Sequence, residues 1–217
     1  GEMATVIQYP MSNTSWAAPK PADEGYQIAY SVDADGNSIY TADMTDEQKY
    51  EAALQASISF FKAAGYTFDE ATGKFTAAPE GAEMTYEVII PGGGTGDHPA
   101  FGILTAAKEA LATIGITLQI NDPSDSSVWN NALEANTAEM WAGAWGATVD
   151  PDMYQVYHSD NANGKGTNSN HYSIEDADLD EMIIAARNSA DQSYRKATYK
   201  ECLETILDWG VEIPTYQ

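Results

Sequence analysis

The order of secondary-structure signals between residues 84 and 146 restricts this chain to a small set of folds. Residues 84–90, 116–120 and 140–146 are rich in β-branched, aromatic or small side chains and predict three strands. Apolar residues at helical spacing occupy 97–115 and 125–136 between them. Strands that alternate with helices predict an α/β architecture, in which helices flank a parallel or mixed sheet.

Further helices are predicted on both sides of this alternating region. Thr45 and Gln48 match a capping box, and Gly65 suits the residue that follows a helix, so a helix of about 19 residues is expected here. Residues 66–83 are expected to form a small, turn-rich segment. Asp97 is expected to be the N-cap of the next helix, which has Pro99 in its first turn. Residues 176–188 and 192–209 predict two C-terminal helices.

The first 45 residues have a different character. The prolines in residues 9–24 predict an extended surface segment, and the Asp- and Gly-rich turn at 33–37 predicts a hairpin. The turn is not a calcium loop, because Ser38 and Met44 stand where a glycine and a bidentate glutamate would be needed. We therefore expect an arm over residues 1–45 and an α/β lobe over 46–217.

The charge of the chain excludes several classes of function. Ten Lys and Arg residues stand against 33 Asp and Glu, which gives a net charge of −23. Nucleic acids and anionic lipid surfaces would repel such a chain. No run of apolar residues is long enough for a membrane span, and no signal peptide is expected at the start. The single cysteine, Cys202, permits no internal disulfide.

Ligands of open α/β sheets collect at the carboxyl ends of the strands, and three loops qualify here. The first contains Gly94, Thr95 and Asp97 and precedes a helix N-terminus. It lacks the lysine of a phosphate loop and the third glycine of a dinucleotide fingerprint. It is either a flexible turn or a loop whose backbone approaches a ligand, for instance a ligand carboxylate.

The second loop contains Trp145, Gly146, Ala147, Thr148 and Asp150. Trp145 is either a core plug or a platform on which a ligand stacks. Asp150 precedes a proline, so it is either a turn or capping residue or an acceptor for a ligand ammonium.

The third loop, residues 161–172, is rich in Asn and Gly, and it is either a solvated connector or a source of amide side chains for a polar ligand. The histidines, His98, His158 and His171, lack the spacing of a zinc helix. We expect no metal and no cofactor. No G-x-S-x-G elbow is present, and no catalytic residue is assigned.

An ordered set of segments resembles a known family. In order and spacing it resembles the C-terminal lobe of the extracytoplasmic solute-binding proteins of ABC importers, in the class that binds oligopeptides, dipeptides, nickel complexes and some sugars. The resemblance covers roughly residues 46–217. The segments are Ala63–Tyr66, Leu111–Leu118, Met140–Gly146, Asp150-Pro151, Asp178–Asp180, Tyr194–Tyr199 and Ile213–Tyr216.

The resemblance implies a periplasmic-binding-protein-like fold and a two-lobed receptor that closes on its ligand about a hinge. It implies that the N-terminal lobe of the same protein is absent from this chain, that ABC permease subunits are partners, and that the protein is extracytoplasmic and lipid-anchored. The implied ligand is a peptide or similar small polar solute, and the implied activity is binding without catalysis.

One departure from the family pattern leaves the ligand class open. Peptide-binding members often carry, shortly after the matching tryptophan, an aspartate that receives the ammonium of the peptide. Thr148 is the third residue after Trp145 here, and Asp150 matches the aspartate of the Asp-Pro pair instead. Two other functions remain as alternatives to solute binding. One is a carbohydrate-active surface enzyme domain that uses carboxylates and aromatic platforms, and the other is a structural or adhesion domain.

Overall fold

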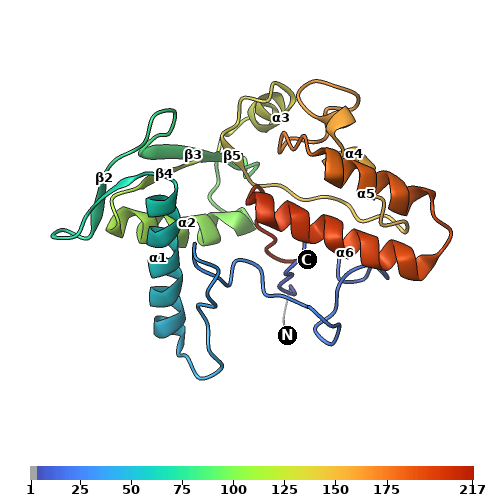
Figure 1. The fold of residues 1–217 in the computed structure, drawn as a ribbon. Helices are drawn as coiled ribbons and strands as arrows, with labels where there is room; N and C mark the ends of the chain where they lie inside the picture. Colours follow the sequence, from blue (N-terminus) through green and yellow to red (C-terminus); the bar gives the residue numbers. More distant parts are fainter. Residues whose placement is uncertain (1–3) are drawn as a thin grey trace. The chain divides into compact units, whose positions relative to one another are not determined.

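The computed structural model describes residues 4–217, which divide into two compact units. Unit 1 consists of the described residues up to Tyr30 together with Trp145–Gln217, and unit 2 is Ser31–Ala144 (Figure 1). The chain therefore leaves unit 1 once and returns to it once. The arm and lobe expected from the sequence stay a prediction.

Unit 2 contains a three-stranded parallel sheet. Strand β3 (Thr85–Ile89) lies in the centre, between β4 (Thr117–Asn121) and β5 (Met140–Trp141). In this register Val88 lies opposite Ile120 of one neighbour and Met140 of the other. Of the two alternatives left open by the sequence, parallel and mixed, this sheet is parallel.

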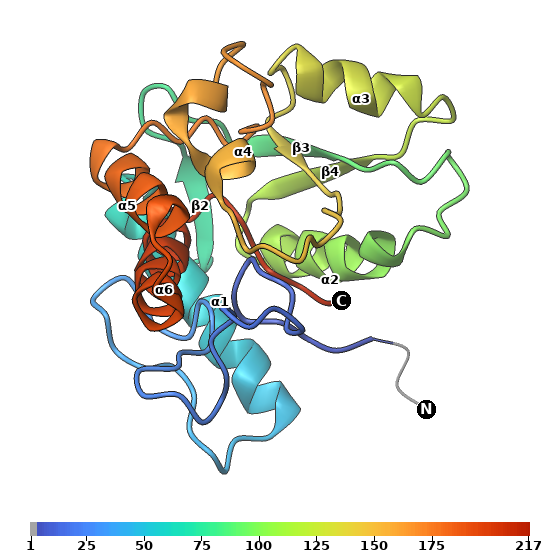
Figure 2. The same cartoon turned by 90° about the vertical axis from the view of Figure 1, so that its right-hand side faces the viewer.

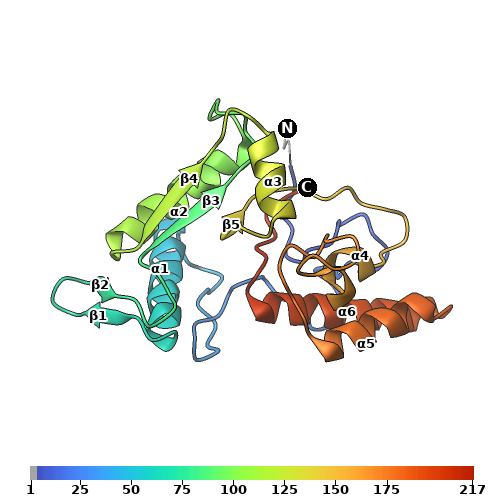
Figure 3. The same cartoon turned by 90° about the horizontal axis from the view of Figure 1, so that it is seen from above.

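Helices α2 (Pro99–Thr113) and α3 (Ser127–Glu134) make the connections between these strands, as predicted. Figure 3 shows α2 running along the sheet beside β3 and β4. Its first turn is capped by His98, whose Nδ1 accepts a hydrogen bond from Ala100 N–H at 3.1 Å, so the expectation that Asp97 is the cap is wrong by one residue. Apolar side chains fill the space between α2 and the sheet: the buried Val88, Ile90 and Leu118, and the partly buried Phe101, Leu104 and Leu111 from the helix.

Helix α1 (Asp46–Ala63) begins at the predicted capping box. The side chain of Thr45 accepts from Gln48 N–H, and the side chain of Gln48 accepts from Thr45 N–H, so two free donors of the first turn are satisfied. The segment that follows forms a hairpin of β1 (Thr67–Asp69) and β2 (Lys74–Ala77), where the sequence predicted only turns.

An aromatic cluster explains why so short a hairpin is stable. The ring of Phe75 lies 5.3 Å from Phe61, 6.0 Å from Tyr66 and 4.9 Å from Phe68 between ring centroids. Phe75 is only 4% exposed. Each such pair adds to the free energy of burying the rings, so the hairpin is stabilised by packing against α1 rather than by its own ladder.

Unit 1 is mainly helical, with α4 (Tyr154–Tyr157), the 3₁₀ turn η1 (Ser159–Asn161), α5 (Ala177–Asn188) and α6 (Gln192–Trp209). Figure 2 shows α5 and α6 lying side by side. Both long helices match their predicted bounds closely, and α6 ends at Gly210, whose φ of 67° is the left-handed conformation that glycine adopts without strain.

The core of unit 1 includes residues that the sequence placed on the surface. Tyr9 is 3% exposed and Ala17 is fully buried, so the prediction of an extended surface segment over residues 9–24 is wrong for these positions. They pack against the apolar faces of α5 and α6, which provide enough buried area to order a proline-rich segment without secondary structure. The other buried members are Met153, Tyr157, Ile174, Leu179, Ile183, Ala186, Tyr199, Cys202, Leu203 and Ile206.

The first and last described segments of unit 1 pair with each other. Val6 and Tyr216 form an antiparallel bridge, and backbone hydrogen bonds join Thr5 to Gln217 in both directions at 2.9 Å.

The predicted hairpin near residue 35 is reduced to a single bridge between Val32 and Ser38 around an Asp33–Asn37 turn. Within residues 4–217, no helix is both long and apolar enough to cross a bilayer.

Candidate functional site

The loop after β5 begins earlier than the sequence predicted. The expected strand over residues 140–146 is wrong beyond Trp141, where β5 ends. The last bond of the ladder runs from Ala142 N–H to Ile89 O at 3.0 Å, and the indole of Trp129 donates to Ala142 O, also at 3.0 Å. A side chain therefore satisfies the carbonyl that a longer strand would use, and residues 142–150 continue as irregular backbone.

Trp145 is a surface residue of unit 1 rather than a core plug, since 47% of its area is exposed. Its ring is stacked with the imidazole of His171, with the two planes 14° apart and the centroids separated by 6.5 Å. Its indole N–H is hydrogen-bonded to the hydroxyl of Tyr172. An exposed aromatic face with a fixed orientation is the arrangement that a stacking platform requires.

Through Tyr172, this tryptophan is connected to the carboxylate of Glu212 and to a second phenol, Tyr157. The Tyr157 hydroxyl donates to Glu212 Oε2 at 2.7 Å, and Tyr172 is hydrogen-bonded to the same carboxylate. Burial raises the pKa of Glu212 to about 7, although the hydrogen bonds from the two phenols act in the opposite direction. Burial also raises the pKa of both phenols, and the nearby carboxylate adds to this effect. Sequence reasoning missed this cluster, because its members are far apart in the chain.

The end of the 145–150 loop is bound to helix α6. Both oxygens of Asp150 accept from Nη2 of Arg195, at 2.9 and 3.1 Å, and Thr148 Oγ1 donates to Asp150 O at 2.6 Å. Gly146 lies in open space, since a side-chain carbon placed there would contact nothing within 4 Å. Ala147 is exposed as well. The carboxylate expected to receive a ligand ammonium is thus already paired within the protein.

A second arginine binds the residues just beyond. Arg187 Nε lies 3.1 Å from Asp152 Oδ2, and its guanidinium stands 4.5 Å from the ring centroid of Tyr154. Arg187 belongs to α5 and Arg195 to α6, so each helix of the pair contacts one side of Pro151. The two aspartates that flank this proline therefore fix the course of the loop relative to the helices of unit 1.

The predicted glycine loop lies in unit 2, and an internal carboxylate occupies it. Gly96 N–H donates to Asp122 Oδ2 at 3.2 Å. Backbone N–H groups of Gly94, Gly96 and Gly92 lower the pKa of Asp122, that of Gly94 most strongly. A loop whose backbone approaches a ligand carboxylate is one of the two alternatives that the sequence leaves open. The backbone of this loop does approach a carboxylate, but that carboxylate belongs to the chain itself. Thr95 Oγ1 donates to Gly92 O at 3.1 Å and accepts from Asp97 N–H.

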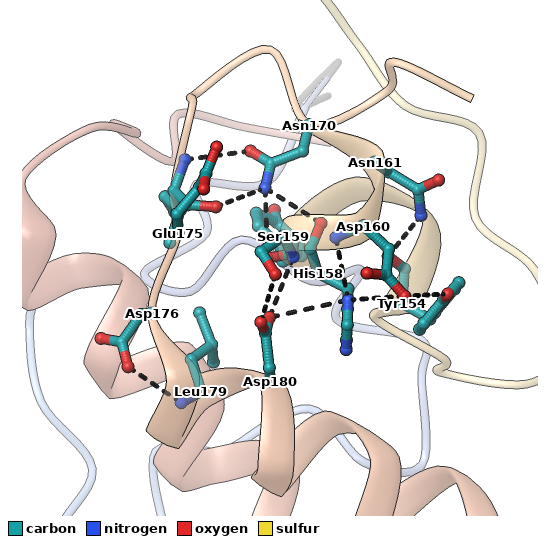
Figure 4. Close-up of polar contacts among 12 residues, drawn as sticks. Tyr154, His158, Ser159, Asp160, Asn161, Asn170, Glu175, Asp176, Leu179 and Asp180 are labelled. Atoms are coloured by element: carbon teal, nitrogen blue, oxygen red, sulfur yellow. Dashed lines mark hydrogen bonds and ion pairs between the residues drawn. The ribbon is translucent and has the colours of Figure 1, made fainter. Parts of the chain in front are cut away.

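The third loop is organised around a buried amide (Figure 4). Asn170 is fully buried, and its Nδ2 donates to the carbonyls of Tyr157, His158 and Ile174 at 3.2, 3.3 and 2.9 Å. Since this amide is used to close the loop, it is a structural residue rather than a ligand contact.

The neighbouring polar residues in Figure 4 also bind one another. Asp180 accepts from Ser159 N–H at 2.9 Å and from the Ser159 hydroxyl, and His158 Nδ1 accepts from Asp160 N–H at 3.1 Å. Because Nδ1 is an acceptor from the backbone, it is not oriented to remove a proton from Ser159. The group stabilises the turn η1 and anchors it to α5.

Two other features of the described residues bear on the site. Across residues 4–217 no group of three His, Cys, Asp or Glu side chains is arranged to hold a metal ion. A shallow depression of about 420 Å³ lies beside α1 in unit 2 and includes none of the predicted ligand residues. It is lined by Thr41, Asp43, Met44, Gln48, Glu51, Ala52 and Gln55.

Comparison with known proteins places the fold. No family model and no curated protein matches the chain. Among solved structures, the chain matches the oligopeptide-binding protein AppA from Bacillus subtilis in complex with a nonapeptide, with a TM-score of 0.67 and 16% identity over 98% of this chain and 36% of that chain. It also matches NikZ from Campylobacter jejuni in complex with Ni(L-His), with a TM-score of 0.68 and 18% identity over the same shares.

A third match is the oligopeptide-binding protein from Thermus thermophilus complexed with a pentapeptide, with a TM-score of 0.67 and 14% identity over 99% of this chain and 33% of that chain. The chain thus has the fold of one part of these binding proteins, and the resemblance seen in the sequence is confirmed at the level of fold. It spans about a third of the length of the solved structures that it matches.

Proposed function

We propose that this chain forms part of the substrate-binding component of an ABC importer, which captures a peptide or similar small polar solute between two lobes. The observation that carries the proposal is the match of 98% of the chain, at TM-scores of 0.67 and 0.68, to binding proteins solved with a peptide and with a nickel–histidine complex. An exposed, oriented tryptophan on the loop after a parallel strand supports the same role.

Trp145 is the residue to which we assign the main ligand contact. Its open face would stack on a planar or apolar part of the solute, while the exposed backbone of Gly146, Ala147 and Thr148 would offer hydrogen bonds. Asp150 would act through its pairing with Arg195, which fixes the loop. For unit 2, taken by itself, Gly94, Thr95 and Asp97 remain the proposed ligand contacts.

This assignment has a consequence for the solute. The position that often carries the amine-binding aspartate is Thr148, and the nearby Asp150 is neutralised by an arginine. Recognition would therefore rest on stacking and backbone hydrogen bonds rather than on an ion pair with a terminal ammonium. We further propose ABC permease subunits as partners, and an extracytoplasmic location with a lipid anchor in the whole protein.

The proposal is tested by titrating the longest natural protein that contains these 217 residues. One arm uses pools of two- to nine-residue peptides, and the other uses nickel with L-histidine, both followed by calorimetry. We expect binding in one arm, and a loss of roughly three- to tenfold in affinity for Trp145→Ala, the value of one aromatic contact. Trp209→Ala is the matched control, because 48% of that indole is exposed in the same unit.

Two results would overturn the proposal. The first is an absence of binding in both arms by a protein that is folded. The second is an equal loss of affinity for the Trp145 and Trp209 variants, which would show that the effect comes from general destabilisation. The 217-residue chain alone is expected to bind more weakly than about 100 µM, because the contacts of the other lobe would be missing.

A further inference from the structure

A chain of hydrogen bonds connects the exposed indole of Trp145 to a carboxylate inside unit 1. The indole N–H donates to the hydroxyl of Tyr172, and the hydroxyl of Tyr172 donates to Glu212. The three residues come from three separate segments: the loop after β5, the loop before α5, and the segment after α6. A contact that joins three irregular segments fixes all of them at once.

The surroundings of Glu212 leave its carboxylate few ways to be solvated. Tyr157 donates to it at 2.7 Å, and the rings of Tyr157 and Tyr172 are stacked 10° from parallel with centroids 5.6 Å apart. The hydroxyl of Tyr30 donates to the backbone carbonyl of Glu212. The titratable groups that face the carboxylate are thus phenols, and the imidazole of His171 is stacked with Trp145.

The proton on Glu212 decides what Tyr172 can do. A neutral carboxyl group is both donor and acceptor, so it does not hold the hydroxyl of Tyr172 as a donor, and the hydroxyl proton can turn toward the indole N–H and break that contact. An ionised carboxylate accepts only, and a charge-assisted hydrogen bond is roughly twice as strong as a neutral one. Ionisation therefore holds the hydroxyl of Tyr172 as a donor to Glu212 and leaves its oxygen free for the indole.

We propose that Tyr172 and Glu212 are positioning residues that fix the indole of Trp145, and that loss of the proton from Glu212 tightens this hold. The inference depends on the proposed function only for the role given to Trp145 as a ligand platform. The link itself is a property of unit 1 and can be measured without any ligand. The value of about 7 for the pKa of Glu212 places the transition near neutral pH.

The test observes the indole N–H signals in ¹H–¹⁵N spectra of the 217-residue chain, which has five tryptophans. Trp145→Phe identifies the signal of interest. In Tyr172→Phe the ring remains and the hydroxyl is lost, so we expect this signal to move upfield, toward the position of a water-exposed indole. Tyr157→Phe is the matched control, because it removes a hydroxyl that is hydrogen-bonded to Glu212 and to Tyr172 but keeps both the Tyr172 hydroxyl and its contact with Trp145.

A pH titration provides the second readout. Between pH 5 and 9 we expect the Trp145 signal of the wild type to shift with a midpoint near 7, the pKa of Glu212. The shift is expected to persist in Tyr157→Phe and to disappear in Glu212→Gln and Tyr172→Phe. The imidazole of His171 is stacked with Trp145, and any transition caused by that ring would survive in Glu212→Gln.

Each outcome decides the proposal. A Trp145 signal that is unmoved by Tyr172→Phe, or a titration that persists in Glu212→Gln, would overturn it. Should Tyr172→Phe fail to fold, the Glu212→Gln titration still decides, since the amide keeps the shape of the side chain. None of these results depends on a solute. The proposed function can therefore be overturned while the hydrogen-bonded link from Trp145 to Glu212 is confirmed, and the link can be overturned while solute binding is confirmed.

Discussion

Arg195 binds both carboxylate oxygens of Asp150, at 2.9 and 3.1 Å, and so joins the end of the 145–150 loop to helix α6. The same guanidinium donates through Nε to Ala186 O at 2.9 Å and through Nη2 to the hydroxyl of Tyr199 at 3.2 Å. The two partners differ in burial, since the side chain of Arg195 is 15% exposed and that of Asp150 is 59% exposed. Because the two side chains differ in burial, removing Arg195 and removing Asp150 should change the free energy of unfolding by different amounts.

We expect Arg195→Ala to lower the free energy of unfolding by about 2 kcal/mol and Asp150→Ala by less than about 1 kcal/mol. The arginine variant removes the 2.9 Å side-chain hydrogen bond to Ala186 O and leaves this carbonyl only the 3.4 Å bond from Ser189 N–H, whereas the aspartate variant removes only a largely exposed charge. Urea unfolding of the two variants measures the difference. Equal losses would show that the ion pair alone provides the stability.

Glu212 makes unit 1 sensitive to pH in a predictable direction. Its pKa is raised to about 7 in the folded chain, above the value of about 4.3 for a free glutamate, so the folded state favours the protonated form. This contribution is complete below about pH 4.3 and is lost as the pH rises through 7. We expect Glu212→Gln to become more stable relative to the wild type by about 3 kcal/mol between pH 4.5 and 8.

Urea unfolding of both proteins at several pH values measures this change. The comparison between variant and wild type cancels the titration of the other 32 acidic groups, since the chain has 33 Asp and Glu. A difference that does not vary with pH would contradict the burial of the carboxylate.

Two adjacent isoleucines of α5 provide a matched pair for the core. Ile183 is fully buried and Ile184 is 37% exposed. Ile183→Ala should cost about 2–5 kcal/mol, because the cavity it leaves lies among packed helices, and Ile184→Ala should cost less than about 1 kcal/mol. Chemical denaturation measures both values, and similar losses would show that the register of α5 differs from the one described here.

The glycine loop of unit 2 makes a steric prediction. A Cβ at Gly92 would lie 2.6 Å from Oδ1 of Asp122, whereas one at Gly102, within α2, would meet nothing within 4 Å. We expect Gly92→Ala to be destabilising and Gly102→Ala to be stabilising by about 0.5–1 kcal/mol, the usual helix preference for alanine.

Thermal unfolding of the single variants tests the sign of each effect. The double variant Gly92→Ala with Asp122→Ala should recover part of the loss, because the clash needs both side chains. Purely additive losses would place the cause outside this contact.

Local signals determined how well the sequence could predict each element. The capping box at Thr45 predicted the start of α1, and apolar side chains at helical spacing predicted α6, whose end at Gly210 the structure adds. The strand expected at 140–146 was predicted too long, because the donor that replaces its ladder is the indole of Trp129, on another element. Nothing in a local window shows that contact.

One part of the candidate site could likewise be proposed from local sequence signals, and another part could not. Its exposed part, Trp145 with the residues that follow, could be proposed from the order of strand and loop, and its role as a ligand contact stays a prediction. The supporting part could not be proposed, because Glu212 is 55 residues from Tyr157 along the chain and belongs to no motif. The burial of Tyr9 and Ala17 was missed for a similar reason, since only the distant helices α5 and α6 create the apolar surface that they cover.

The pairing of residues 5–7 with 215–217 determines the order in which the polypeptide can mature during synthesis. Unit 2 is complete once Ala144 has left the ribosome, so its parallel sheet can assemble while translation continues. Residues 4–30 are made before unit 2, but residues 5–7 stay unpaired until residues 215–217 have been synthesised. The segment that precedes unit 2 in the chain therefore acquires these native contacts later than unit 2 does, and chaperones would meet it in that exposed interval.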